Sequence, residues 1–344
     1  MATQMKVIQA GVGGFGKQWV KTLAADRAVK VVGLVDLKED ALEAACALGG
    51  HTKDICFGSL KEALGKVAAD AVVCVTPPEH HRRVVVEALR TGLDAISEKP
   101  MAGTMADCKA MLRTARETGR TYAVSQNYRY MPAMWTVADL IRRGRIGEVG
   151  QVTIDFFKGV RFGGFRSRMD YPLLIDMSIH HFDLIRFLTG LDPLSVHGVS
   201  WNPAWSHYAG DASSSVLFEM ANGARVIYNG SWCAKGDYCD WAGNWRIEGS
   251  KGTILYRNGN LRLVKAALYK QDTDEPVAVK DRPRTPQASV LHDFMRARRN
   301  GRPAQTDVAD NIKSVAMVFA AVQAVKSGRR VPVLDKGLRT LLAG

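Results

Sequence analysis

The chain has 344 residues, of which 47% are hydrophobic and 24% are charged. This length supports two domains with cores of their own, and the composition excludes a disordered or fibrous protein. The formal net charge of +13 would suit nucleic acid or an anionic ligand, but Lys and Arg are scattered along the chain. Their densest groups, residues 142–145 and 296–299, lie at predicted helix ends, where cations complement the helix dipole. We therefore expect no nucleic-acid partner, whereas a negatively charged substrate or cofactor stays open.

The cellular location is predicted from what the sequence lacks. No apolar run approaches the length of a membrane span, and the N-terminus leads directly into the first predicted strand. The six cysteines have no C-x-x-C spacing, which is typical of reduced thiols without a metal site. We expect a cytoplasmic protein with no signal peptide, no membrane association and no bound metal.

The first third of the chain alternates predicted strands and helices. Short apolar runs predict strands at residues 6–10, 29–35, 54–57, 71–75, 94–97 and 122–125. Helical patterns fall between them at 17–24, 39–48, 59–67, 79–90 and 105–118, the last with Thr104 as its N-cap. This alternation predicts an α/β fold with a doubly wound parallel sheet over residues 1–125. Ligands bind such sheets beyond the carboxyl ends of the strands.

A glycine-rich turn follows the first predicted strand and opens the first predicted helix. It consists of Gly11, Val12, Gly13, Gly14, Phe15 and Gly16. Gly11 would allow a tight turn, Gly13 would let a pyrophosphate approach the backbone, and Gly16 would let the helix pack against the strand. The helix N-terminus then offers free N–H groups to the phosphates. The turn, in this context, predicts a dinucleotide-binding site.

An acidic residue follows where a ribose should lie. Asp36 ends the second predicted strand, about 20 residues beyond the glycine turn. Its carboxylate would bind the adenosine ribose hydroxyls and repel the extra phosphate of NADP, which favours NAD. Lys38 lies two residues further on and could reach a phosphate, so NADP stays open.

Two further turns lie at the carboxyl edge of the predicted sheet. Residues 76–81 follow the fourth strand and either make a simple strand-to-helix turn or contact the cofactor. Glu98, Lys99 and Pro100 follow the fifth strand, and Lys99 lies where the nicotinamide should be. An ammonium group there can hydrogen-bond a substrate hydroxyl and favour its alkoxide character, and Pro100 permits a cis bond. The alternative is a lysine in solvent at a strand end.

The pattern changes near residue 126. Helices are predicted at 132–143, 173–188, 290–299 and 308–327, and strands at 150–158 and repeatedly between 194 and 264. Two Asn-Gly pairs, at 222–223 and 258–259, indicate hairpin turns, because both turn positions need a positive φ. We expect residues 126–344 to form an α+β domain with a largely antiparallel sheet.

One predicted helix of this second region carries a carboxylate and an imidazole. Asp176 and His180 are four residues apart and would share one helix face, whereas His181 and Asp183 would point elsewhere. A carboxylate beside an imidazole can move a proton near neutral pH. An ordinary pair on a helix surface is the alternative.

A basic loop with glycines precedes this helix. Within residues 157–168, Lys158, Arg161 and Arg166 could bind hydroxyls, a carboxylate or a phosphate, although a solvated loop is equally compatible. Most tryptophans also lie in this second region, where they could stack on a sugar or pack in the sheet and a subunit interface.

Together these motifs resemble the glucose–fructose oxidoreductase / inositol dehydrogenase (Gfo/Idh/MocA) family of NAD(P)-dependent oxidoreductases. The resemblance covers nearly the whole chain. Its motifs are the glycine turn, T-P-x-x-x-H at Thr76, Pro77 and His81, E-K-P at residues 98–100, N-x-R-x-x-P at Asn127, Arg129 and Pro132, D-x-x-x-H at Asp176 and His180, and the closing segment 325–331. The set in this order is specific, although no single motif is.

The resemblance implies a Rossmann domain and a C-terminal domain, residues 126–344, with an open sheet through which members dimerise or tetramerise. It implies that Lys99, Asp176 and His180 are catalytic. His180 would be the general base, Asp176 would bind the substrate hydroxyl and orient His180, and Lys99 would polarise the reacting oxygen. With the motif analysis, it gives as cofactor-binding positions Gly11, Val12, Gly13, Gly14, Phe15, Gly16, Asp36, Lys38, Thr76, Pro77, His81, Glu98, Lys99 and Asn127. The candidate substrate-binding positions are Arg129, Lys158, Arg161, Arg166 and His181.

The sequence departs from the family pattern near the proposed base. The family often has a glycine pair before D-x-x-x-H, where this chain has residues 171–174, and a glycine where this chain has Ser178. A bulkier pocket wall is expected. His181 beside His180 leaves open which imidazole faces the pocket, although the spacing from Asp176 favours His180.

We therefore expect an NAD(P)-dependent dehydrogenase that acts on a secondary hydroxyl of a sugar, cyclitol or related polyol. Two alternatives stay open. One is a glycosidase or lyase that uses tightly held NAD to oxidise its sugar transiently. The other is an NAD-sensing regulator without enzymatic activity, against which the intact set of Lys99, Asp176 and His180 argues.

Overall fold

The computed structural model describes residues 4–267 and 270–343. The chain divides into two compact units. The first comprises Met1–Asn127 and Arg284–Ile312, and the second comprises Tyr128–Pro283 and Lys313–Gly344. The sequence analysis placed all of residues 126–344 in one domain, whereas the structure returns a late segment to the first unit.

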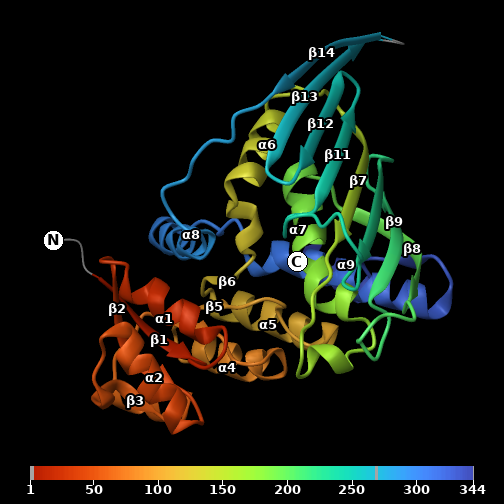
Figure 1. Ribbon diagram of the computed structural model, residues 1–344. Coiled ribbons are helices and arrows are strands. Elements are labelled where there is room, and N and C mark those ends of the chain that lie inside the picture. The colour runs from red at the N-terminus through yellow and green to blue at the C-terminus, as the bar shows by residue number, and fades with distance from the viewer. Residues whose placement is uncertain (1–3, 268–269, 344) are drawn as a thin grey trace. The chain divides into compact units, whose positions relative to one another are not determined.

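The first unit is a doubly wound parallel sheet with helices, as predicted (Figure 1). Its six described strands lie in the order β3-β2-β1-β4-β5-β6, so the order reverses between β1 and β4. A ligand binds at such a reversal, beyond the carboxyl ends of the strands. The strands are β1 (Met5–Ala10), β2 (Val29–Val35), β3 (Cys56–Phe57), β4 (Ala71–Cys74), β5 (Asp94–Ser97) and β6 (Tyr122–Val124).

Helices connect these strands close to the predicted positions. They are α1 (Gly16–Ala24), α2 (Glu39–Gly49), α3 (Leu60–Lys66), α4 (Pro78–Arg90) and α5 (Met105–Thr118). The hydroxyl of Thr104 accepts a hydrogen bond from the backbone N–H of Asp107 at 3.1 Å, which confirms the predicted N-cap. The strand predicted at 54–57 is shorter, because Lys53–Ile55 form a 3₁₀ turn and only the last two residues pair with β2.

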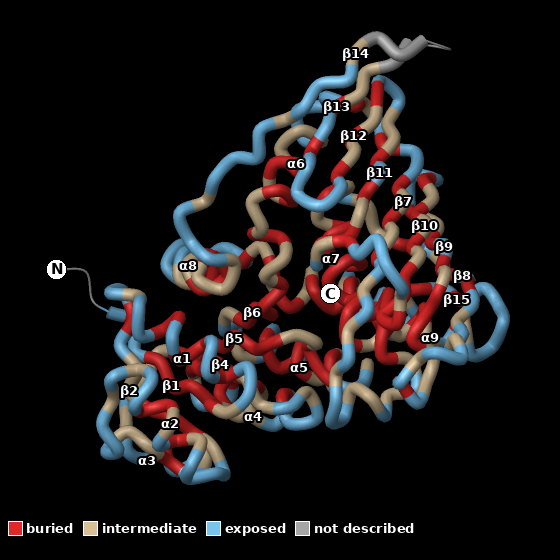
Figure 2. Tube along the Cα trace, viewed as in Figure 1, coloured by how far each residue is buried: buried red, intermediate tan, exposed pale blue. Residues whose placement is uncertain are grey.

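The core of this unit lies along its central strands. Every residue of β4 and β5 is buried, and so is every residue of β1 except Lys6 (Figure 2). Strands buried on both faces are near-continuous apolar runs, which is why the sequence predicted them well.

The late segment joins the first unit through helix α8 (Pro286–Asn300). The guanidinium of Arg298 donates to Asp70 at 2.9 Å and to Asp94 at 2.7 Å. The backbone N–H of Val124 donates to the carbonyl of Thr306 at 2.9 Å. These bonds involve residues about 200 positions apart in the sequence, which no local pattern predicts.

The second unit is built on a large, mostly antiparallel sheet. Its nine described strands lie in the order β14-β13-β12-β11-β7-β10-β9-β8-β15, and β7 and β10 are parallel. This confirms the predicted antiparallel character. The strands are β7 (Val149–Phe157), β8 (Pro193–Trp201), β9 (Ser213–Met220), β10 (Arg225–Ser231), β11 (Asn244–Gly249), β12 (Gly252–Arg257), β13 (Asn260–Ala267), β14 (Lys270–Pro276) and β15 (Val331–Pro332).

Both predicted Asn-Gly hairpins are present. Residues 222–223 join β9 to β10, and residues 258–259 join β12 to β13. Asn258 and Gly259 have φ values of 47° and 85°, as a tight hairpin turn requires. Two strands were not predicted: β14 has a polar sequence without apolar alternation, and β15 has only two residues.

The remaining helices are α6 (Pro132–Arg142), α7 (Ser178–Thr189), α9 (Val308–Ser327) and α10 (Lys336–Ala343), with short 3₁₀ turns at Asn127–Tyr130 and Arg166–Arg168. The helix predicted at 173–188 begins with a π-helical turn, Leu173–Met177, before α7. Among the described residues, α9 is the one helix long and apolar enough to cross a membrane, by length and composition only. However, 61% of its apolar window is buried inside the protein. A buried core helix passes the same test.

Candidate functional site

The glycine turn between β1 and α1 is tightly packed at two glycines and open at a third. Gly11 has a φ of +88°, and a Cβ there would lie 2.6 Å from the carbonyl carbon of Val75. A Cβ at Gly16 would lie 2.4 Å from the carbonyl oxygen of Gly11. A Cβ at Gly13 would meet no described heavy atom closer than 4.0 Å. The turn therefore fits a dinucleotide, whose pyrophosphate can approach the backbone at Gly13.

Asp36 lies at the edge of this turn and also stabilises it through hydrogen bonds. Its Oδ2 accepts hydrogen bonds from the backbone N–H groups of Val12 at 3.0 Å and Gly13 at 3.4 Å. Its Oδ1 accepts one from the N–H of Lys38 at 3.1 Å. A single carboxylate thus links the end of β2 to the glycine turn and places a negative charge where an adenosine ribose is expected.

His81 connects the turn after β4 with the turn after β5. Its ring is fully buried, with Nε2 2.8 Å from the carbonyl oxygen of Thr76 and Nδ1 3.1 Å and 3.2 Å from those of Pro100 and Met101. Burial lowers the pKa of His81, and carbonyl oxygens of the two turns face both nitrogens of its ring. This placement favours a positioning role for His81 over direct contact with the cofactor.

Glu98 ties helix α1 to the turn that carries Lys99. The indole N–H of Trp19 donates to Oε1 of Glu98 at 2.6 Å, and the backbone N–H of Lys99 donates to Oε2 at 3.1 Å. Glu98 is buried, and this burial raises its pKa. The same carboxyl group therefore fixes the helix that opens the phosphate site and the residue predicted to meet the substrate. The Lys99–Pro100 peptide bond is cis.

In the second unit, Asp176 lies in the π-helical turn before α7. It is 9% exposed, and the Nε of Arg166 donates to its Oδ2 at 2.5 Å. Ser178 is fully buried, and its hydroxyl donates to the carbonyl of Leu174 at 2.6 Å. The hydroxyl that replaces an expected glycine is thus bonded to the helix backbone. Single π-helical turns are frequent at functional sites.

His180 stacks on a tyrosine that the sequence analysis did not single out. The ring centroids of Tyr128 and His180 are 4.0 Å apart, with an angle of 16° between the planes. Burial raises the pKa of Tyr128, and the charges of Asp240 and Asp176 raise it further. Tyr128 therefore lies within electrostatic reach of Asp176. The available signal was its position between Asn127 and Arg129 in the N-x-R-x-x-P motif.

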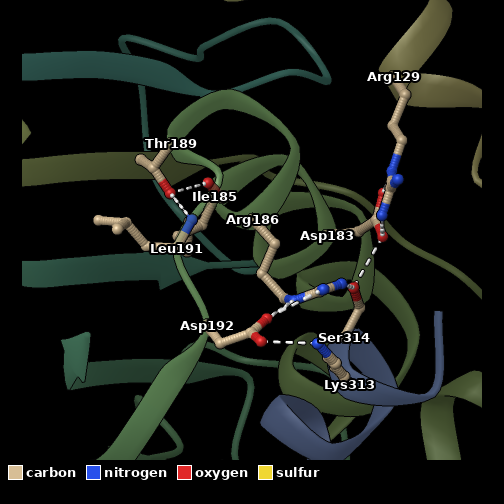
Figure 3. A network of polar contacts seen from close by, with 9 residues as sticks. All are labelled: Arg129, Asp183, Ile185, Arg186, Thr189, Leu191, Asp192, Lys313 and Ser314. Atoms are coloured by element: carbon tan, nitrogen blue, oxygen red, sulfur yellow. Dashed lines mark hydrogen bonds and ion pairs between the residues drawn. The ribbon is translucent and has the colours of Figure 1, made fainter. Parts of the chain in front are cut away.

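A buried ion pair fixes the turn that carries Tyr128 (Figure 3). The Nε and Nη2 atoms of Arg129 donate to the two carboxylate oxygens of Asp183 at 2.6 Å and 2.5 Å. Both side chains are almost completely buried. A buried, bidentate pair of this kind is rigid, because losing either partner leaves an uncompensated charge. This placement favours a positioning role for Arg129 over substrate contact.

The ion pair continues into a polar network that connects α7 with α9 (Figure 3). The hydroxyl of Ser314 donates to Oδ1 of Asp183 at 2.7 Å and accepts from Nη1 of Arg186 at 3.0 Å. Arg186 also donates to Asp192 at 3.2 Å, and Lys313 donates to Asp192 at 2.6 Å. Charged and polar bonds therefore hold helix α7 to helix α9.

His181 faces the sheet. It is fully buried, with Nδ1 3.3 Å from the hydroxyl of Tyr228 and Nε2 3.1 Å from the carbonyl oxygen of Trp241. Burial lowers its pKa to about 4. This placement favours a structural role for His181, and it favours His180 as the imidazole that serves the pocket. Arg161, another candidate substrate residue, is exposed on its loop.

Comparisons with known proteins agree with this geometry. A model of an oxidoreductase family with an NAD-binding Rossmann fold matches residues 5–126, and a model of the GFO/IDH/MocA C-terminal domain matches residues 134–255. The chain is 32% identical to the uncharacterised protein y4oX of Sinorhizobium fredii, over 96% of each chain. It is 29% identical to inositol 2-dehydrogenase of Rhizobium meliloti, over 94% of this chain and 97% of the relative.

Solved structures share the fold. An oxidoreductase from Agrobacterium radiobacter, in complex with NAD⁺, L-tartaric acid and magnesium, has a TM-score of 0.87 at 22% identity, covering 96% of this chain and 99% of the other. Levoglucosan dehydrogenase in complex with NADH has a TM-score of 0.83 at 19% identity, with the same coverage. At these identities the likeness shows the fold, and both structures contain the nicotinamide cofactor.

The buried, neutral state of His181 predicts a dependence of stability on pH. The pKa of His181 is about 4 in the folded protein and 6.5 when the ring is not buried. Between these pH values the unfolded chain therefore binds more protons than the folded protein. The contribution of His181 to the free energy of unfolding is fully present above pH 6.5, and it falls by up to about 3 kcal/mol as the pH is lowered toward 4. We expect His181→Gln to lose less stability than the wild type between pH 7 and pH 5 in urea unfolding.

The matched control is His197→Gln, because His197 is exposed on β8. This control should follow the wild-type pH profile. An identical pH dependence in wild type and His181→Gln would show that the pKa of His181 is the same in the folded protein as in the unfolded chain, contrary to its burial.

Proposed function

The chain belongs to the GFO/IDH/MocA family of NAD-binding oxidoreductases, and we propose that it interconverts a secondary hydroxyl and the matching keto group of a sugar, cyclitol or related polyol. The observation that carries this proposal is the start of α7. There a buried carboxylate, Asp176, and a buried imidazole, His180, stand four residues apart, and Tyr128 stacks on the imidazole. The name of the inositol 2-dehydrogenase relative supports the substrate class.

In the proposed mechanism each residue has one task. His180 accepts the proton of the reacting hydroxyl, since an imidazole titrates near neutral pH. Asp176 accepts a hydrogen bond from a substrate hydroxyl and orients it. The ammonium group of Lys99 donates to the reacting oxygen and stabilises its developing negative charge. NAD, when bound, supplies the acceptor for the hydride.

The buried contacts explain how these groups keep their orientation. The stack with Tyr128 restricts rotation of the His180 ring, and Arg166 fixes one oxygen of Asp176. The bond from its own backbone N–H to Glu98 fixes the chain at Lys99. Groups fixed before the substrate arrives lower the entropic cost of reaching the transition state.

Substitution of the proposed base and of the proposed cation tests this assignment. A first assay follows NADH absorbance with NAD or NADP and a panel of polyols, aldoses, lactones and sugar acids. With the substrate it identifies, Lys99→Met and His180→Ala should each lower kcat by on the order of a hundredfold or more while NAD affinity stays nearly unchanged. The exposed residues Lys61 and His197 provide the matched controls Lys61→Met and His197→Ala.

Retained turnover in both site variants would contradict the assignment. If the whole panel is silent and the purified protein still holds NAD, the reaction is instead a transient oxidation within a glycosidase or lyase. A silent protein that responds to NAD only in its association with partners would be a regulator.

We also propose that the enzyme prefers NAD to NADP, because Asp36 places a negative charge beside the ribose position. Asp36→Asn keeps the size of the side chain and one acceptor for the glycine turn but removes the charge. We expect this variant to shift the ratio of kcat/KM for NADP over NAD upward by on the order of tenfold. Asp36→Ser should shift it in the same direction, and steady-state kinetics with both cofactors measure the ratio.

Lys38 supplies the complementary test. If Lys38 binds the extra phosphate, Lys38→Gln in the Asp36→Asn background should reverse part of the gain for NADP. Unchanged cofactor kinetics in both Asp36 variants would remove Asp36 from the cofactor site.

We further propose that two copies of the chain associate through the open face of the large sheet. On this face β8 and β9 expose apolar side chains, among them Val199 at 57%, Trp201 at 47% and Leu217 at 41%. Soluble monomers rarely expose adjoining apolar side chains of this size, and a second copy would bury them. The family resemblance supports the same surface.

Light scattering during size-exclusion chromatography tests this association. The wild type should elute as a dimer or a larger oligomer, and Leu217→Arg should shift it toward the monomer. Leu37→Arg is the matched control, because Leu37 is 92% exposed but lies in the other unit. A monomeric wild type at micromolar concentration would refute the proposal.

A further inference from the structure

Two cations lie on the segment between β7 and the π-helical turn before α7, and one of them bonds Asp176. The Nζ of Lys158 lies 5.0 Å from the centroid of the Trp241 ring. The backbone of Lys158 is fixed, because its N–H donates to the carbonyl of Ser231 at 2.9 Å and its carbonyl accepts from the N–H of Ala234 at 3.2 Å. The backbone position of Lys158 is therefore fixed, and only its flexible side chain can move.

Arg166 is the second cation, and it bonds Asp176 directly. Its guanidinium lies 5.3 Å from the ring centroid of Phe162 and 4.7 Å from that of Phe165. The bond to Asp176 uses Nε, and 34% of the side chain is exposed. The N–H groups on the two Nη atoms form the planar fork that suits a carboxylate or a phosphate.

The rings beneath the two cations belong to one group. The centroid of Phe162 lies 6.4 Å from that of Trp241 and 5.2 Å from that of Trp232. The hydroxyl of Tyr208 donates to the carbonyl of Val160 at 2.9 Å and so anchors the loop beside these rings. Stacked rings and backbone bonds therefore hold the loop, and both cations rest on them.

The nearby carboxylates are bonded to other groups, and Lys158 contacts the Trp241 ring instead. Asp176 bonds Arg166, and Asp240 accepts hydrogen bonds from the Tyr256 hydroxyl and from the N–H of Ala242. In the described part of the chain no carboxylate pairs with Lys158. A cation held in this way on an aromatic face is available for an oxyanion of the ligand.

We propose that the substrate is a sugar or polyol that carries an oxyanion group, either a carboxylate or a phosphate, and that Lys158 and Arg166 bind this group. The proposal rests on the proposed function and names its substrate class. Because Arg166 bonds Asp176 through Nε, an oxyanion on its Nη groups places the substrate hydroxyls near that carboxylate. A neutral sugar would leave the ammonium group of Lys158 without an anionic ligand, whereas the guanidinium of Arg166 keeps its bond to Asp176.

The test compares acids with their neutral counterparts. NADH formation is measured with D-glucose, D-gluconate, D-glucuronate, a hexose phosphate and myo-inositol, for the wild type, Lys158→Gln, Arg166→Gln and Arg168→Gln. The wild type should favour at least one anionic compound over its neutral counterpart by about tenfold or more in kcat/KM. A preferred acid identifies a carboxylate ligand, and a preferred hexose phosphate identifies a phosphate ligand.

The variants separate binding from chemistry. Lys158→Gln should abolish most of this preference through a higher KM, with kcat nearly unchanged. Arg166→Gln should change KM and kcat together, because Arg166 also bonds Asp176. Arg168→Gln is the matched control, since Arg168 is an exposed arginine of the same loop. Raising the salt concentration should raise KM for the anion more in the wild type than in Lys158→Gln.

Two results would overturn the inference. The first is that the wild type turns over neutral compounds with a kcat/KM equal to or higher than that for the anionic ones, and that Lys158→Gln has no effect. This result would leave the proposed function intact. If no compound reacts, the proposed function fails, and thermal stabilisation by gluconate or hexose phosphate supplies the second result. Stabilisation that Lys158→Gln removes supports the anion site without the reaction, and equal shifts with neutral and anionic compounds refute it.

Discussion

The buried pair of Arg129 and Asp183 is the contact on which the second unit's site depends. Two charges removed from water must satisfy each other, so the turn with Arg129 and helix α7 have little freedom relative to one another. The residue before Arg129 is Tyr128, and the residue three positions before Asp183 is His180. Fixing the pair therefore fixes the ring stack beside it. The extension through Ser314 makes α9 part of the same support (Figure 3).

The first unit uses buried polar contacts in a similar way at the carboxyl ends of its strands. His81 bridges the turns after β4 and β5, and Glu98 bridges the turn after β5 and helix α1. Both residues belong to motifs that suggest ligand contact, yet both are buried and bonded within the protein. A conspicuous polar residue in a motif can therefore serve the shape of a site. Asp36 combines the two roles, since it bonds the glycine turn and stands at its edge.

Local patterns in the sequence predicted the features of the fold that depend on residues close together in the chain. Apolar runs located the parallel strands, glycines with steric requirements located the phosphate turn, and Asn-Gly pairs located two hairpins. The return of α8 to the first unit depends on the bonds of Arg298 to Asp70 and Asp94, which are distant in sequence. The stack of Tyr128 on His180 depends on a tertiary contact for the same reason. The π-helical turn before α7 was missed because its sequence has the apolar spacing of an ordinary helix. The roles of Lys99, Asp176 and His180 remain predictions from motif and placement.

The two kinds of support have different consequences for specificity. Tyr128 and His180 are held by a buried ion pair, so substitutions there disturb packing and charge together. Lys158 and Arg166 lie on a loop that backbone hydrogen bonds and ring contacts hold in place. Substitutions that change the charged ends of its side chains therefore cost little stability. Substrate choice can therefore vary while the groups proposed for proton transfer keep their geometry. Arg166 is the exception, because its bond to Asp176 joins the two sets. A change at Lys158 alters which substrate binds, whereas a change at Arg166 must also alter how the bound substrate reacts.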